Sequence, residues 1–230
     1  MKNIIKYFLP LCLLIFMSGC DDNNSLHQKY LDEGETLYAG KVEAINPTPG
    51  NERVKFIWLL NSDPRIYKTV FYWNEGNDSE EVLINREQSG FLIKETVIDI
   101  PEGIYTFRII NVDDEGHTSI ATEVTVQIYG PTYISRLLNR NIKLSSLSDA
   151  TLTIDWATIE SDLVQYTTVR YTDRSDPTNP VTKSVTVENT DTQTVIEGVA
   201  EDDVFSISTA YLPEGCLDIL DAVPVEYTIR

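Results

Sequence analysis

The chain offers few side chains that could act as a nucleophile or a general base. Only two histidines occur, His27 and His117. His117 lies in one short stretch with Asp113 and Ser119, so the residue types of a Ser–His–Asp triad are present. A working triad brings its groups together from separate elements, beside an oxyanion hole. We therefore predict a solvated turn here, no catalytic residues, and a protein that is not an enzyme.

Cys216 and the acidic side chains are the other candidates for chemistry. Cys216 has no histidine near it in the sequence, so we predict a quiet thiol in the loop before the last strand. The 36 Asp and Glu residues include many pairs of the kind that glycosidases use. Because any such pair can be chosen at will, none is indicated.

Metal and cofactor sites are not indicated either. Zinc requires clustered nitrogen or sulfur ligands, which the sequence lacks. Residues 113–115 and 173–176 carry carboxylates that could bind calcium, but neither stretch has the alternating spacing of a calcium loop. Glycine-rich nucleotide loops are also missing. We expect no metal and no cofactor.

Aromatic residues give the one candidate for a ligand site. In the strand predicted at 66–73, Val70 and Tyr72 are expected to face the core, and alternation then sends Phe71 and Trp73 to the outer face. Two aromatic rings there could form a platform on which sugar rings stack. The alternative is packing, because large exposed aromatics usually meet a loop or another domain.

The first residues have the pattern of a secretory leader. Lys2 and Lys6 precede an apolar run from 7 to 17, which is too short to span a bilayer as a helix. Small residues and Cys20 follow, which is typical of a signal peptide over residues 1–19. In a plain signal peptide cut near here, Cys20 would be incidental. The alternative is a lipoprotein signal, which makes Cys20 the first residue of the mature chain and residues 20–36 a polar tether.

The composition limits the partners. The chain has a formal net charge of −18, from 36 acidic and 18 basic residues. Such a protein repels the phosphate backbone, so we expect no nucleic acid partner. Hydrophobic residues make up 42% of the chain, which argues against disorder as a whole. With Cys12 in the leader and Cys20 at its end, Cys216 is left without a disulfide partner.

The rest of the sequence has the pattern of short strands. Segments rich in Val, Ile, Thr and aromatics recur between turn residues, without a long helical period. Seven strands within about 90 residues indicate a sandwich of two antiparallel sheets over residues 37–129. The predicted strands lie near 38–45, 53–60, 66–73, 80–85, 92–100, 104–112 and 120–128.

The second half repeats the first. Trp156 follows Trp58 by 98 residues, and Val169 and Tyr171 follow Val70 and Tyr72 by 99. A nearly constant offset predicts a second copy of the same fold over residues 133–230. Its strands are predicted near 133–144, 151–157, 164–172, 182–188, 193–198, 203–211 and 222–229.

Two short motifs resemble signals of bacterial lipoproteins. Residues 17–20 (Met-Ser-Gly-Cys) resemble a lipobox, in which the cysteine is lipidated and anchors the protein to a membrane. Asp21 and Asp22 resemble the surface-export signal of lipoproteins in glycan-harvesting Gram-negative gut bacteria. This resemblance implies an outer-membrane protein, lipid-anchored through Cys20 and facing the exterior.

The sandwiches resemble fibronectin type III modules. The resemblance rests on Trp58 in the second strand, on Val70-x-Tyr72 in the third and on residues 100–108. It implies an all-β protein of two tandem fibronectin type III or immunoglobulin-like sandwiches. Tyr105 would be the tyrosine-corner residue, and Phe205 would replace it in the second copy, without a hydroxyl.

The whole arrangement is similar to two-domain surface lipoproteins found beside glycan-utilisation systems, for which no activity is established. The expected function is that of a non-catalytic accessory protein that binds or captures a polysaccharide at the cell surface. The alternative is a structural spacer, or a module that holds a protein partner in a cell-surface complex.

Overall fold

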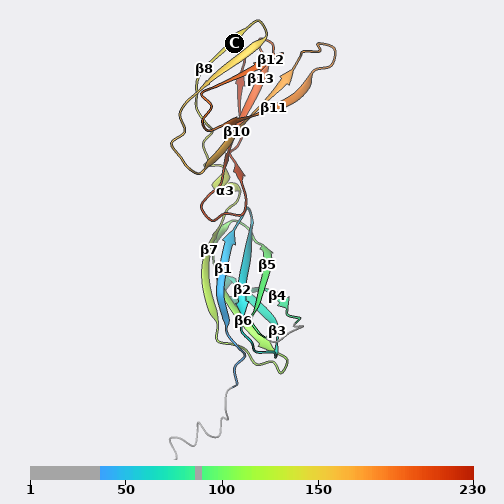
Figure 1. Cartoon of the computed structure of the whole chain (residues 1–230), viewed down its shortest axis with the longest axis vertical. Coiled ribbons are helices and arrows are strands. Elements are labelled where there is room, and N and C mark those ends of the chain that lie inside the picture. Colours follow the sequence, from blue (N-terminus) through green and yellow to red (C-terminus); the bar gives the residue numbers. More distant parts are fainter. Residues whose placement is uncertain (1–36, 86–89) are drawn as a thin grey trace, which may run out of the picture. The chain divides into compact units, whose positions relative to one another are not determined.

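Two groups of antiparallel β-strands follow one another along the chain in the computed structural model, which describes residues 37–85 and 90–230 (Figure 1). Both groups belong to one unit, Ala39–Arg230. Cys20, Asp21 and Asp22, with the predicted signal peptide and tether, lie outside the described residues. Within the described ranges, no helix has the length and hydropathy needed to cross a membrane.

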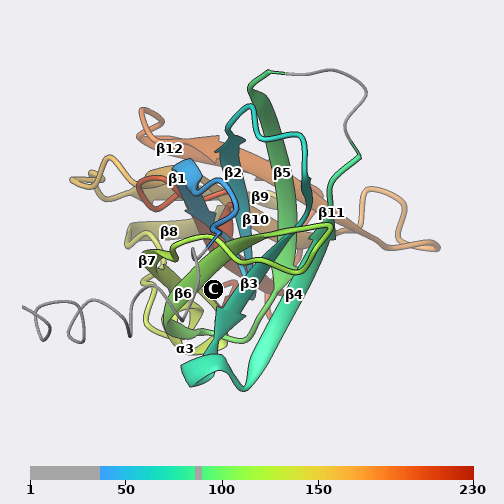
Figure 2. The ribbon, with the colours of Figure 1, turned by 90° about the horizontal axis from the view of Figure 1, so that it is seen from below.

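The first group forms a sandwich of two sheets. One sheet has the order β1-β2-β5 and the other β4-β3-β6-β7, and β3 and β4 run side by side in Figure 2. A short 3-10 helix, η1 (Asn74–Gly76), follows β3. The strands are β1 (Val42–Pro49), β2 (Arg53–Leu60), β3 (Ile66–Trp73), β4 (Asp78–Leu83), β5 (Leu92–Asp99), β6 (Gly103–Asp113) and β7 (Thr122–Ile128).

The second group repeats this arrangement. One sheet has the order β12-β9-β8, and in the other β11, β10 and β13 are followed by β14 and β15, which both pair with β13. Each copy thus combines a three-stranded sheet with a larger one, of four strands in the first copy and five in the second, which confirms the predicted tandem fibronectin type III-like fold. The strands are β8 (Ile142–Ser148), β9 (Thr151–Trp156), β10 (Val164–Asp173), β11 (Val181–Glu188), β12 (Gln193–Glu197), β13 (Val204–Tyr211), β14 (Leu220–Asp221) and β15 (Val225–Thr228).

The start of the second copy differs from the prediction. The sequence predicts a strand over residues 133–144, but a single helical turn, α3 (Pro131–Ile134), comes first, and β8 begins only at Ile142. Pro131 suits the first turn of a helix, because its missing N–H is not needed there. The carboxylate of Glu102 accepts hydrogen bonds from the backbone N–H groups of Thr132 (2.6 Å) and Tyr133 (2.8 Å), which lack partners within the helix.

The strand registers show that the repeat has a constant offset of 98 residues through both cores. Phe71 lies opposite Ile109 in the first copy, and Val169 lies opposite Ile207 in the second. Trp58 and Trp156, also 98 apart, are 1% and 2% exposed. The internal repeat predicted from the sequence is therefore confirmed, and its offset is 98 for the third strand as well, not 99.

This offset corrects the predicted orientation of β3. Phe71 is fully buried between the sheets, with its ring centroid 4.9 Å from that of Phe56 and 5.1 Å from that of Trp58. Val70 and Tyr72 belong instead to the opposite face of the sheet. Every residue from Val70 to Trp73 is apolar or aromatic, so alternation alone could not tell which set faces the core.

The assignment of the corner tyrosine also changes. Phe205 is the counterpart of Phe107, not of Tyr105, and both phenylalanines are buried in their cores. Tyr105 packs at the edge of the first core, with its ring centroid 6.3 Å from that of Phe107. Its hydroxyl makes no hydrogen bond with any described residue, so the tyrosine-corner contact that the resemblance implied does not form here.

A buried arginine ties the strand connections of the second copy together. Arg140 is 6% exposed, and its guanidinium donates hydrogen bonds to the carbonyls of Ala157 (3.0 Å), Glu188 (3.0 Å) and Asp191 (2.7 Å). It also lies 5.4 Å from the ring centroid of Trp156. Burial lowers the pKa of Arg140, but arginine stays protonated in proteins.

Candidate functional site

The aromatic platform predicted at Phe71 and Trp73 does not form. Phe71 is a core residue, and Trp73 is half-buried, with its ring centroid 5.6 Å from that of Phe107. Trp73 does line a pocket of about 330 Å³ that Tyr72 and Arg108 also line. Because Arg108 lies over the Tyr72 ring (6.0 Å to the centroid), part of that aromatic surface is already covered.

The three residues with triad chemistry do not form a triad. His117 Nδ1 lies 3.0 Å from the carboxylate of Asp113, so the structure brings these two together. The Ser119 hydroxyl instead donates to the carbonyl of Ile120 (3.0 Å) and accepts from the backbone N–H of Asn111 (2.9 Å). The group organises a turn, but this turn is not the solvated one predicted, because Asp113 and Ser119 are buried (0% and 5% exposed).

The acidic stretches weighed as calcium sites form hydrogen bonds within the protein. Asp173 contacts Lys183 and accepts a hydrogen bond from the backbone N–H of Ser175 (2.8 Å). Asp176 accepts from the backbone N–H (3.0 Å) and the hydroxyl (2.6 Å) of Thr178. Over residues 37–85 and 90–230, no three His, Cys, Asp or Glu side chains gather in a way that could hold a metal ion.

The pairing of Asp173 predicts an acid-sensitive contribution to stability. The hydrogen bond from Lys183, and then those from Ser175, hold the pKa of Asp173 well below its ordinary value. The carboxylate therefore stabilises the folded state fully when the pH is above the pKa of Asp in the unfolded chain, about 3.9. This stabilisation is lost as the pH falls through the lower pKa that Asp173 has in the folded state. Thermal unfolding between about pH 5 and pH 2 should therefore depend less on pH in Asp173→Asn than in the parent protein. Equal pH dependence in the two proteins would contradict this.

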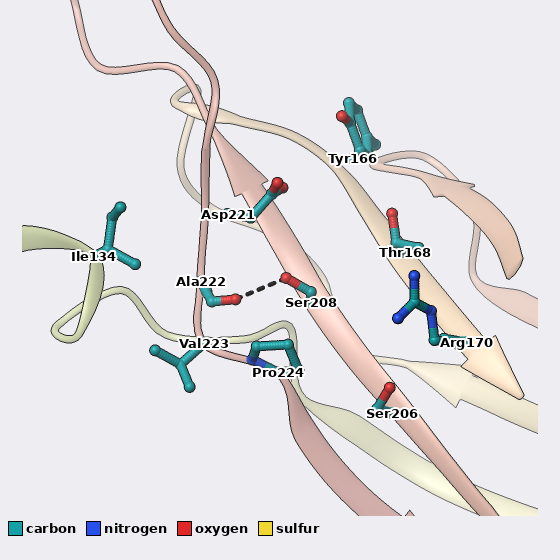
Figure 3. Close-up of a pocket in the computed structure, with 10 residues that line it drawn as sticks. All are labelled: Ile134, Tyr166, Thr168, Arg170, Ser206, Ser208, Asp221, Ala222, Val223 and Pro224. Carbon is teal, nitrogen blue, oxygen red and sulfur yellow. Dashed lines mark hydrogen bonds between the residues drawn. The ribbon is translucent and has the colours of Figure 1, made fainter. Parts of the chain in front are cut away.

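A groove on the outer face of the second copy is larger than the pocket beside Trp73. This β10–β13 groove has a volume of about 440 Å³ and lies between β10, β13 and the segment that links β14 to β15. In Figure 3, β13 runs along its floor, β10 forms one side, and the segment 222–224 and Ile134 form the other. The lining residues are Ile134, Tyr166, Thr168, Arg170, Ser206, Ser208, Asp221, Ala222, Val223 and Pro224.

A bulge in the edge strand shapes this groove. Asp221 lies opposite Ala210 and Val225 lies opposite Ile207, so the segment 222–224 faces only Ser208 and Thr209. Three residues opposite two constitute a β-bulge, and Pro224 lacks the N–H that would continue the ladder. The Ser208 hydroxyl donates to the carbonyl of Ala222 (2.7 Å), which fixes the bulged segment beside the groove.

Several polar groups of the groove have no partner among the described residues. The hydroxyls of Tyr166, Thr168 and Ser206 and the guanidinium of Arg170 make no hydrogen bond or ion pair with any described residue, and Figure 3 shows all four on one side of the bulge. Tyr166, Thr168 and Ser206 are half-buried. Polar groups that converge on a concave surface without protein partners are typical of a ligand site.

The equivalent face of the first copy is closed. With the 98-residue offset, Thr168 corresponds to Val70 and Ser208 corresponds to Ile110. Val70 and Ile110 are buried, with 1% and 6% of their surface exposed. These residues form a small apolar cluster with Val112, Tyr72 and Ala121. The same sheet face therefore carries an apolar cover in one copy and an open polar groove in the other.

A family profile described as a domain of unknown function, DUF4998, matches residues 20–219. The chain belongs to this family. No curated protein was found to match the DUF4998 chain in sequence.

Two solved structures are similar to the DUF4998 chain. One is the structure of the FN1–FN3 domains of chicken CNTN1, which is 12% identical in sequence, with a TM-score of 0.34. The match covers 84% of this chain and 66% of that structure, just under two thirds of its length. A segment of two fibronectin type III domains from chicken tenascin is 13% identical, with a TM-score of 0.31, over 83% of this chain and 99% of that one.

Sequence reasoning missed the groove of this DUF4998 chain. The sequence did contain a sign of the groove. Tyr166, Thr168 and Arg170 alternate along one predicted strand, so they share a face, and Ser206 and Ser208 alternate in the same way along the predicted strand at 203–211. The bulge at 222–224 could also have been predicted. Pro224 lies within the strand predicted near 222–229, and a proline inside a strand indicates an edge or a bulge.

Proposed function

We propose that this protein is a non-catalytic lipoprotein of the outer membrane, anchored through Cys20 and exported to the cell surface by the signal at Asp21 and Asp22, where it captures glycan. The leader and the lipobox-like motif support the anchor. The match to the family also begins at Cys20, the residue at which we expect the mature chain to start. The observation that carries the binding function is the β10–β13 groove with its unpartnered polar groups.

The chemistry of the groove suits a sugar. Sugar rings present hydroxyl groups at their edges and C–H groups on their faces. The groove offers hydroxyls on β10 and β13, and apolar side chains at Ile134, Val223 and Pro224 on the opposite side. Its volume of about 440 Å³ falls in the range of small-molecule sites. One or two sugar units of a longer chain would fill it.

The groove supports binding better than hydrolysis. Glycosidases use two carboxyl groups that flank the bond to be broken. Asp221 is the single carboxylate among the residues that line the groove. A site that recognises sugar hydroxyls without a second carboxylate is suited to capture.

A glycan-binding assay tests this proposal. We expect the purified chain to be retained in affinity gels by at least one class of polysaccharide. Tyr166→Ala combined with Thr168→Ala should weaken retention at least about tenfold, because each lost hydrogen bond contributes about 1 kcal/mol and the tyrosine ring is lost as well. Tyr67→Ala is the matched control, since Tyr67 is an exposed tyrosine of the first copy (40% exposed). Failure to bind any polysaccharide would overturn the proposal.

The second candidate function, holding a protein partner, is favoured by a different surface. β5 is an edge strand of the first copy, and its side chains Ile93 and Val97 are 71% and 50% exposed. Exposed apolar edge strands can pair with another chain. Recovery of a stoichiometric protein partner from membranes, lost in Ile93→Lys with Val97→Lys and independent of glycan, would favour this function.

A further inference from the structure

Arg170 carries a positive charge without a counter-ion in the described part of the chain. Arg174, just beyond the end of β10, donates three hydrogen bonds to the carboxylate of Asp203 (2.7–3.0 Å). Arg65 likewise pairs with Asp63 (3.1 Å). Arg108 and Arg136 are also exposed and form no ion pair with a described residue, so the missing counter-ion alone does not set Arg170 apart. Arg170 differs in lining the β10–β13 groove, and this position points to a role outside the fold.

The neighbours of Arg170 leave it free for a ligand. Its cross-strand partners are Ser184 on β11 and Ser206 on β13, which are both neutral. Thr168 precedes it on the same face of β10. Asp221, the carboxylate of the groove, makes no ion pair with Arg170 and lies away from it in Figure 3. The guanidinium thus lies among hydroxyl groups.

We infer that the β10–β13 groove selects glycans that carry an anionic group, a carboxylate or a sulfate, and that Arg170 binds this group. This inference rests on the proposed function, since it names the class of glycan. A planar guanidinium binds two oxygens of such a group through parallel N–H···O bonds. The hydroxyls of Ser206 and Thr168 can donate to the same group or to the sugar ring beside it.

The overall charge of the protein makes the inference easier to test. With a net charge of −18, diffuse electrostatic attraction to a polyanion is disfavoured. Retention of an acidic polysaccharide by this protein therefore requires a local site.

Matched titrations test the inference. The purified chain is titrated calorimetrically with uronate polymers (polygalacturonate, alginate and hyaluronate), with carboxyl-reduced polygalacturonate, and with dextran sulfate against dextran. We expect at least one acidic polymer to bind about tenfold or more tightly than its neutral counterpart. An affinity ratio of this size is what one charge-assisted hydrogen bond to Arg170 would produce. Arg170→Gln should abolish this preference without changing the melting temperature. Lys143→Gln, which removes one exposed positive charge from β8 of the same copy, should retain it.

The outcomes separate the inference from the proposed function. Preference for the uronates assigns a carboxylate, and preference for dextran sulfate assigns a sulfate; both support the inference. Neutral glycans that bind as tightly as acidic ones, or a preference that Arg170→Gln leaves unchanged, overturn the inference while the proposed function stands. Failure of all acidic and neutral glycans to bind overturns both.

Discussion

Phe71→Ala should lower the free energy of unfolding of the first copy by about 4 kcal/mol, as measured by urea denaturation. Phe71 has no exposed surface and packs against Phe56 and Trp58. Removing a fully buried phenyl ring loses its transfer free energy and leaves a cavity. The fluorescence of Trp58, which contacts Phe71, provides the signal for this transition.

Phe91→Ala is the control for this prediction. Phe91 is 68% exposed, so its truncation should change the free energy of unfolding by less than about 0.5 kcal/mol. If Phe71→Ala instead left stability nearly unchanged and reduced glycan binding, then Phe71 would be an exposed platform residue, and its assignment to the core would be wrong.

Arg140→Ala should destabilise the second copy by about 3 kcal/mol in the same assay. The substitution leaves the carbonyls of Ala157, Glu188 and Asp191 without their donor and removes the cation above Trp156. Hydrogen bonds from a charged donor contribute about 1.5–3 kcal/mol each when they are buried, and relaxation with water entry recovers part of the loss.

Arg140→Lys separates charge from geometry. Lysine keeps the charge, but it cannot direct several N–H groups in a plane, so it should recover less than half of the loss. Arg136→Ala is the matched control, because Arg136 is an exposed arginine four residues earlier. Full recovery with lysine would show that the charge alone matters, and that the network of carbonyls contributes little.

Much of the fold could be predicted because local patterns and long-range packing agree. Short strands between turn residues, and two tryptophans 98 residues apart, indicated two copies of one sandwich, and the registers of β3 with β6 and of β10 with β13 confirm this. The facing of β3 could not be predicted, since Phe71 and Val70 are both apolar and both buried, on opposite faces of the sheet.

The candidate site was harder to predict because it depends on what lies beside a residue after folding. Arg170 looks like any charged residue of a strand until the structure shows that its cross-strand neighbours are serines. The groove exists because the segment 222–224 bulges away from β13, which follows from a register shift of one residue. Arg140 likewise gains its role from carbonyls that are 17 to 51 residues away in the sequence.

The most direct test of the central claim is hydrogen exchange measured by mass spectrometry, with and without a polysaccharide that the protein retains. We predict that added glycan slows exchange in peptides that cover β10, β13 and residues 220–225, and that the Tyr166→Ala and Thr168→Ala double variant loses this protection. Protection confined to the first copy, for example in peptides that cover β3 and η1 near Trp73, would contradict the assignment of the binding site to the β10–β13 groove.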